Sequence, residues 1–392
     1  MLLQKPAFLL FYHARAAEAS FGEWLGVLWH GLSLDCTVAG YVTAFPVLVV
    51  LASFWIPLSQ RVWRIVLTVY FSLIALVTAA IFAVDLNLYG YWGFRLDGSV
   101  LIYLSDPGEA LASASWGEVL RQILIMLVYA GAMIWSYRWI LRLFRVEPVP
   151  LRGRVVPTVA ALLIGGLTFL AIRGGVTVAT ANVSKVYFSS NMFLNHAATN
   201  PVFSFLSSVG DNENYAEAYP FFEEERRKTL FEELRGNRPG ADAGTPRLLR
   251  SDRPNVVLIL LESFGRTIMD ETVNGEPVMP NMQRFKREGV WFENFFANSF
   301  RTDRGQVAVL CGFPAQTTMS IMKLPRKSAT LPSLARSLGR EGYRSVFMYG
   351  GDLNFTNQAS FMYSTGWEEL IWQKDMQLDA PTSKWGYAGD VV

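Results

Sequence analysis

The chain of 392 residues is poor in the residue types from which most metal and redox sites are built. It has 2 cysteines and 3 histidines, and no histidine follows His196. Two cysteines cannot form a disulfide framework, and the sequence contains no CxxC, HExxH, P-loop or dinucleotide-binding glycine motif. The net charge of +2 gives no basic field that would attract nucleic acid, so we expect no nucleic-acid partner.

Charged residues are also scarce, at 17% of the chain against 51% hydrophobic residues, and the apolar excess lies before residue 175. A helix needs roughly 20 apolar residues to cross a bilayer. Four segments meet this length, namely Cys36–Ile56, Ile65–Val84, Gln122–Leu141 and Val155–Ile172. We therefore predict a transmembrane domain over residues 1–173.

The connections between these segments predict their orientation, because cytoplasmic loops carry an excess of lysine and arginine. Two connections are basic and contain Arg61 and Arg64 in the first, and Arg142, Arg145, Arg152 and Arg154 against Glu147 in the second. The connection between the second and third segments is acidic. We therefore predict a multi-pass protein of the plasma (inner) membrane whose C-terminal part is extracytoplasmic, or periplasmic.

This orientation also places the residues before Cys36 outside. The apolar run AFLLFY, residues 7–12, is too short to span a bilayer. We therefore expect four complete helices here and five in the full protein, the first being missing or clipped at the N-terminus. A cleaved signal peptide is the alternative.

Residues 174–253 are predicted to be a linker with helices at the membrane surface. NMFLNHAATNPVFSFL is amphipathic and is interrupted at Asn200 and Pro201, and FFEEERRKTLFEELRG is a charged helix with ion pairs at helical spacing. His196 is interpreted as an interfacial hydrogen-bonding residue, with a ligand role as the alternative.

Residues 254–392 alternate strand and helix patterns, which is typical of an α/β domain. The run Asn255–Leu261 has the composition of a strand buried on both faces. Further strands are predicted at 290–296 and 343–351, and helices at 279–289, 331–342 and 355–366. Glu262 follows the first strand, at the sheet edge where functional groups gather.

The stretch RTDRG places Thr302 directly before a predicted helix at Asp303–Cys311. One interpretation is a helix N-cap. The other is a nucleophile, because the start of a helix favours anions, while Arg301 and Arg304 could neutralise the oxygens of a transferred group. The spacing leaves both open.

NVVLILLESFGR, FRTDRGQVAVLCGFPAQ, KLPRKSATLPSLARSLGREGYRSVFMYGGDLNFTN and SKWGYAGD together resemble the lipoteichoic acid synthase branch of the alkaline phosphatase/sulfatase superfamily. The resemblance implies a multi-pass helical membrane domain followed by an α/β sulfatase-like domain of the alkaline phosphatase type. Because the family continues beyond these motifs, we expect a fragment that carries the N-terminal part of that domain.

The resemblance also implies a site. Glu262 and Thr302 would bind a divalent metal ion, manganese first, with zinc or magnesium as alternatives. Thr302 would take a phosphoglycerol group from a membrane phospholipid and pass it, through a phosphothreonine, to a hydroxyl of a glycan, lipid or polymer. Candidate substrate-binding residues are Arg301, Arg304, Asp352, Lys384 and Trp385. Asp352 could instead cap the following helix.

Other functions remain open. Phosphoethanolamine transfer would use the same threonine, although enzymes of that kind usually have disulfide-rich outer domains. A sulfatase-like hydrolase would need a cysteine or serine in a C/S-x-P-x-R pattern, which Asp303 and the residues after it do not supply. Cys311 lies too far into the helix for this role and is interpreted as a packing residue. A metal-free regulatory membrane protein of the same fold is the non-enzymatic alternative.

Overall fold

The computed structural model of the chain describes residues 1–98, 100–101, 115–145, 150–209, 221–235, 251–262, 264–316, 319–383 and 386–387. The chain forms two compact units, of which the first joins Met1–Asp211 with Phe296–Val392 and the second is Asn212–Phe295. The division of the sequence at residues 173 and 253 stays a prediction.

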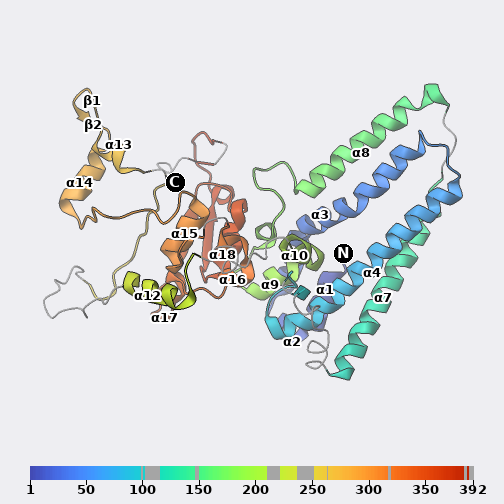
Figure 1. Cartoon of the computed structure of the whole chain (residues 1–392), viewed down its shortest axis with the longest axis horizontal. Coiled ribbons are helices and arrows are strands. Elements are labelled where there is room, and N and C mark those ends of the chain that lie inside the picture. Colours follow the sequence, from blue (N-terminus) through green and yellow to red (C-terminus); the bar gives the residue numbers. More distant parts are fainter. Residues whose placement is uncertain are drawn as a thin grey trace. The chain divides into compact units, whose positions relative to one another are not determined.

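The membrane part is built from helix pairs. Among the described residues, 4 helices are long and apolar enough to cross a membrane. They are α3 (Phe21–Ser53), α4 (Gln60–Trp92), α7 (Trp116–Leu141) and α8 (Val155–Arg173), the last preceded by the turn η1 (Leu151–Gly153). Helix α3 packs against α8, and α4 packs against α7 (Figure 1). The four predicted segments are therefore confirmed as helices.

Helices α3 and α4 are each 33 residues long, or about 50 Å, which exceeds the roughly 30 Å of a bilayer core. The extra length precedes Cys36 in α3 and follows Val84 in α4. Because the two helices are connected by a short turn, these extensions belong to the same side of the membrane. They provide a platform on which the rest of the unit packs.

A buried polar layer joins short helices to this platform. Lys5 of α1 (Gln4–Phe11) forms an ion pair of 2.6 Å with Asp35 of α3, and the Asn200 side-chain amide donates to the same carboxylate at 2.8 Å. Asp85 of α4 pairs with Arg95 at 3.1 Å. Since an unpaired buried charge is costly, the contacts of Lys5 and Asn200 with Asp35 specify how α1 and the linker meet α3.

The linker folds into α9 (Met192–Ala198) and α10 (Pro201–Ser208), as the sequence predicted. The break between them is set by Asn200, whose side-chain oxygen accepts the N–H groups of Val202 and Phe203. Pro201 occupies the first helical position, where its missing N–H costs nothing. The predicted charged helix is α12 (Glu224–Arg235), in which Lys228 pairs with Glu224 at 2.9 Å.

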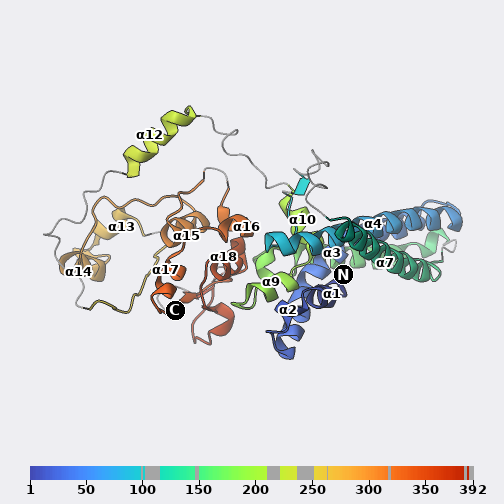
Figure 2. The same ribbon diagram turned by 90° about the horizontal axis from the view of Figure 1, so that it is seen from below.

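Residues 296–392 contain a small parallel sheet covered by helices. Strand β3 (Val346–Tyr349) pairs with β4 (Glu369–Trp372) in parallel, Val346 lying opposite Glu369. The sheet and the helices α15 (Thr302–Cys311), α17 (Leu334–Arg340) and α18 (Gln358–Ser364) lie together in both views (Figures 1 and 2). Their shared core contains Val307, Leu310, Cys311, Met322, Leu331, Phe361 and Met362. This segment is the part of the α/β domain that the structure forms.

Two predicted strands are not formed in the described residues. The run Asn255–Leu261 belongs to the second unit and contains no strand, and its apolar side chains are exposed, Val257 by 82%. The segment 290–296 is likewise irregular. A strand of this composition needs a neighbour on each side and a cover on both faces. The strands that form among the described residues of the second unit are β1 and β2, of two residues each.

The remaining elements are short connections. They are α2 (His13–Ala16), η2 (Val183–Val186), α13 (Arg266–Asp270), β1 (Thr272–Val273), β2 (Glu276–Pro277), α14 (Pro280–Glu288), η3 (Ile321–Lys323), α16 (Pro325–Ser328), η4 (Phe355–Asn357) and η5 (Gln373–Asp375).

His196 generates a prediction about acid stability. Its Nδ1 lies 3.1 Å from the Tyr89 hydroxyl, and burial, reinforced by the charge of Arg95, lowers the pKa of its imidazole from 6.5 to about 3. Below pH 6.5 the His196 imidazole is therefore protonated in the unfolded chain, whereas it stays neutral in the folded chain. Stability should fall by up to ~1.4 kcal/mol per pH unit between pH 6.5 and 3.

The control is His196→Gln, which keeps a polar side chain that does not titrate. Thermal unfolding of both proteins in detergent between pH 7.5 and 4.5 measures the difference in slope. We expect the variant to lose stability less steeply than the wild-type protein. If stability fell with pH at the same slope in both proteins, His196 would not be held neutral by its surroundings.

Candidate functional site

The candidate nucleophile opens a helix. Thr302 is half-buried at the first position of α15, one residue earlier than the sequence predicted, and Arg301 is the N-cap in extended conformation. The Arg301 carbonyl accepts the N–H groups of Arg304 and Gly305, which starts the helical hydrogen bonds. The N–H groups of the first turn point out of the helix at this end, so the Thr302 side chain lies where a negative charge is favoured.

The apolar stripe of α15 fixes this helix in the core. Val307, Leu310 and Cys311 pack in one apolar cluster with Met322 and Phe361. Gly312 ends the helix at a φ of 64°, a left-handed conformation that glycine adopts without strain. The carbonyl of Asp303 accepts the Ser320 hydroxyl at 2.9 Å. The apolar contacts of α15 and this hydrogen bond together hold the first turn of the helix in place.

The two arginines beside Thr302 have different environments. Arg301 is exposed, and its Nε lies 3.6 Å from the buried carboxylate of Asp303. Arg304 is buried, and its guanidinium lies 5.6 Å from the ring centre of Phe300. Arg301 precedes the helix as its N-cap, and Arg304 lies in the first turn. Their role in substrate binding stays a prediction.

Asp352 follows β3 and makes the contacts of a turn-capping residue. Its carboxylate accepts the Asn354 backbone N–H at 2.9 Å and the Asn354 side-chain amide at 2.8 Å. Lys185 of the linker is a neighbour that the sequence did not reveal. Burial lowers the pKa of the Lys185 amine, while the charge of Asp352 acts to raise it. No local pattern connects two residues so far apart in the chain.

Glu262, the other expected metal ligand, is exposed and belongs to the second unit, whereas Thr302 belongs to the first. Their pairing stays a prediction. Lys384 and Trp385 lie outside the described residues. The residues that flank them, Ser383 and Gly386, pair with each other, and the Tyr387 N–H donates to the Gly350 carbonyl at 2.8 Å.

The residues that the structure describes include no group of three or more His, Cys, Asp or Glu side chains that could hold a metal. Hard divalent ions take six or more oxygen ligands, of which Glu262 and Thr302 would supply two. The described side chains therefore do not fit a complete metal centre.

Comparison with known proteins connects this geometry to a family. Residues 254–387 match the sulfatase family. The chain is 36% identical over 153 residues to phosphoglycerol transferase I of Xanthomonas campestris pv. campestris strain B100, covering 36% of this chain and 21% of that protein. It is 31% identical over 130 residues to lipoteichoic acid synthase 1 of Bacillus subtilis strain 168, covering 30% of this chain and 19% of that protein.

The chain carries a sulfatase domain of the lipoteichoic acid synthase-like family. It spans about a fifth of the length of the curated relatives that it matches. No solved structure matches it. Sulfatase-superfamily proteins are generally metal-dependent, and the four apolar helices indicate a membrane protein.

The sulfatase domain places Cys311 in its core, which generates a prediction. Burial raises the pKa of this thiol to about 11, against the opposing charge of Arg336. The chain's other cysteine, Cys36, is changed to alanine, so that Cys311 is the sole thiol. At pH 7.5 we expect maleimide to label native Cys311 about a hundredfold or more slowly than a free thiol, because the thiolate is the reactive form.

Complete labelling after unfolding in denaturant is the control, since it shows that the thiol is intact. Rapid stoichiometric labelling of the folded protein would instead identify Cys311 as an accessible, reactive residue.

Proposed function

We propose that this protein transfers a phosphoglycerol-type group from a membrane phospholipid to an acceptor hydroxyl, with Thr302 as the nucleophile. The observation that carries this proposal is the position of Thr302, the first residue of α15 within a sulfatase domain, between Arg301 and the buried Arg304. The names of the relatives, phosphoglycerol transferase and lipoteichoic acid synthase, support the choice of transferred group.

The reaction proceeds in two displacements at phosphorus. In the first, the Thr302 Oγ forms a bond to phosphorus, the bond from phosphorus to the diacylglycerol oxygen breaks, and that oxygen receives the proton lost by Thr302. In the second, an acceptor hydroxyl oxygen bonds to phosphorus, the phosphorus–Oγ bond breaks, and Thr302 regains a proton. The products are diacylglycerol and the acceptor phosphodiester. The acceptor is a hydroxyl of a glycan, a lipid or a polymer.

Residues of the chain have defined tasks in this scheme. The amides at the start of α15 favour negative charge at the Thr302 oxygen. Arg301 and Arg304 neutralise the phosphoryl oxygens, since guanidinium groups bind phosphate through paired N–H donors. Glu262 and Thr302 would be two of the ligands of a divalent ion, manganese before zinc or magnesium, and such an ion would act as a Lewis acid.

The orientation of the spans decides on which side of the membrane the sulfatase domain lies. We propose that the basic connections are cytoplasmic, so that the sulfatase domain lies on the outer side of the plasma (inner) membrane. The donor lipid and the nucleophile are then confined to one surface, which raises their effective concentration.

Substitution tests the two key residues in proteoliposomes that contain headgroup-labelled phosphatidylglycerol. Thr302→Ala and Glu262→Ala should each reduce diacylglycerol release by about a thousandfold or more, because each removes part of the reacting centre. Thr330→Ala and Glu271→Ala are matched controls at exposed positions outside the site and should retain the wild-type rate.

Thermal unfolding of each variant confirms that the fold is intact. A wild-type rate in Thr302→Ala or in Glu262→Ala would show that the residue takes no part in the reaction. Release of labelled glycerol phosphate without an acceptor product would indicate a hydrolase.

A further inference from the structure

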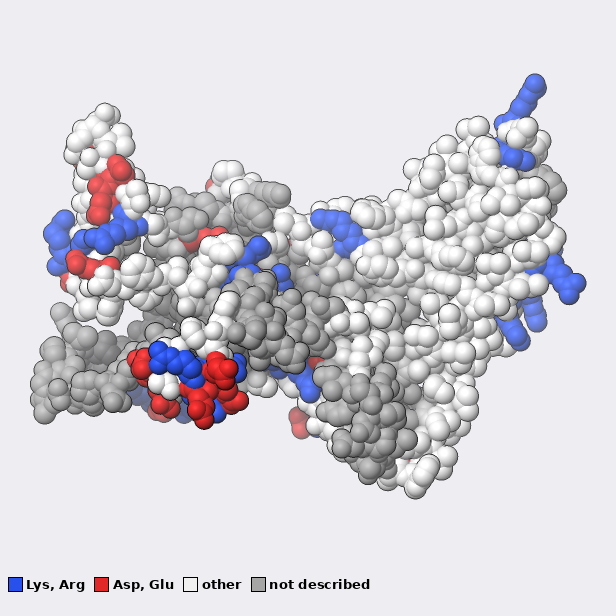
Figure 3. Space-filling model, in the orientation of Figure 1, with Lys and Arg blue, Asp and Glu red and all other residues white. Residues whose placement is uncertain are grey.

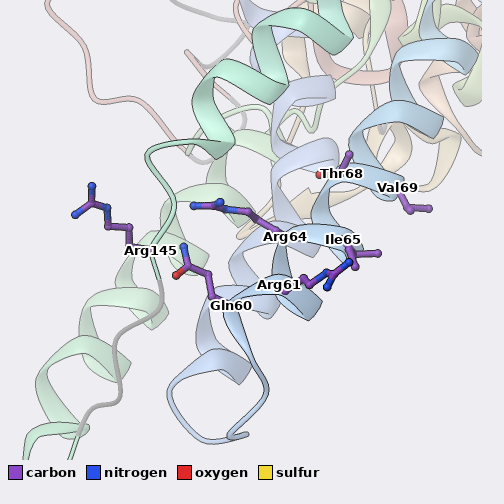
Figure 4. Close-up of a pocket in the computed structure, with 7 residues that line it drawn as sticks. All are labelled: Gln60, Arg61, Arg64, Ile65, Thr68, Val69 and Arg145. Atoms are coloured by element: carbon purple, nitrogen blue, oxygen red, sulfur yellow. The ribbon is translucent and has the colours of Figure 1, made fainter.

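The end of the spans at which α4 begins contains an open hollow that the proposed reaction does not use. It has a volume of about 840 Å³ and is lined by Gln60, Arg61, Arg64, Ile65, Thr68, Val69 and Arg145. Six of these residues form two adjacent columns at intervals of four along α4, and Arg145 comes from the segment after α7. Figure 4 shows Gln60 and Arg64 on the side of α4 toward Arg145, with Arg61 on another side.

The entrance to the hollow is basic. Its lining contains three arginines and no acidic residue. Gln60 and Arg64 are fixed against the end of the α7 region, because both donate to the Phe144 carbonyl, at 3.1 and 3.3 Å. Figure 3 shows lysine and arginine, and no visible aspartate or glutamate, at this end of the spans. An anionic group here would meet only positive charge.

The interior of the hollow is apolar and continues along the helix into the membrane. Ile65 and Val69 are exposed, and each lies about one helical turn further into the span than the residue before it in its column. A headgroup bound by the arginines would therefore place its acyl chains against exposed aliphatic side chains at bilayer depth. A soluble anion would use the arginines but not this column.

We propose that this hollow is a binding site for one anionic diacyl phospholipid of the leaflet in which α4 begins. The phosphate lies between Arg64 and Arg145, Arg61 flanks it from the neighbouring side of α4, and an acyl chain lies along Ile65 and Val69. The general excess of positive charge at cytoplasmic loops accounts for arginines at this end, but not for three of them around one hollow with an apolar column beneath.

This lipid is distinct from the donor of the proposed reaction. Arg61 lies at the start of α4, and Tyr89, near its other end, contacts His196. The helix rises by about 40 Å between these two residues. The lipid instead fixes the α4–α7 pair in one leaflet. The proposal does not depend on the identity of the transferred group.

The test compares two variants with equal loss of charge. The groove variant combines Arg61→Gln, Arg64→Gln and Arg145→Gln. The control variant combines Arg142→Gln, Arg152→Gln and Arg154→Gln, which lie at the same end of the spans outside the hollow. Delipidated protein in neutral detergent is titrated with phosphatidylglycerol and, separately, with phosphatidylcholine of the same acyl chains, and native mass spectrometry follows the first bound lipid.

Wild-type and control proteins should bind the anionic lipid about tenfold or more tightly than the zwitterionic lipid, and the groove variant should lose this preference. A charge-retaining variant, with lysine at the same three positions, should keep most of it even if the glutamine variant unfolds. Equal loss in the groove and control variants would overturn the proposal in favour of a general surface-charge effect. Displacement of the lipid by millimolar inorganic phosphate would overturn it in favour of a soluble anion.

Discussion

The arrangement of the first unit depends on a junction at the ends of the spans. There, residues 296–392 are attached to the linker that follows α8. The Ser184 hydroxyl accepts the backbone N–H of Ser360 at 3.0 Å, and the Asn182 side-chain amide donates to the Asn354 carbonyl at 2.7 Å. Around these bonds, Leu353 and Ala359 pack in one apolar cluster with residues of α1, α3, α4 and α9. Buried polar groups of this kind stabilise only the arrangement in which they are paired, so they define where the sheet is held.

This attachment connects the chemistry to the membrane. Helices α15 and α18 share a core, so the contacts that hold α18 also position the first turn of α15 and Thr302. The buried pairs Lys5–Asp35 and Asp85–Arg95 hold the other side of the same junction. The proposed nucleophile, fixed in this way, would meet lipid headgroups by diffusion within a surface, which suits the proposed donor because that lipid never leaves the bilayer.

The features that the sequence could predict depend on residues that are close together in the chain. Long apolar runs define the spans, the Asn200–Pro201 pair defines a helix break, and the segments around Thr302 and Val346 have the periodicity of a helix and a strand. The junction was not predictable, because Lys5, Asp35 and Asn200 are far apart in the chain and each is unremarkable alone. Asn255–Leu261 shows the opposite case, since its composition predicts a buried strand that forms only where neighbouring strands and covering helices exist. Of the candidate site, the residues around Thr302 are local to one helix start, whereas the pairing of Glu262 with Thr302 stays a prediction.

The central claim is a covalent bond between phosphorus and the oxygen of Thr302. The most direct measurement incubates the protein with phospholipid isotopically labelled in the glycerophosphate headgroup, quenches the reaction in acid before an acceptor is added, and maps the peptides by mass spectrometry. The account predicts a labelled phosphoglycerol group on the peptide that contains Thr302, and its loss when acceptor is supplied before the quench. Turnover with no label on that peptide, or with the label on another residue, would contradict it.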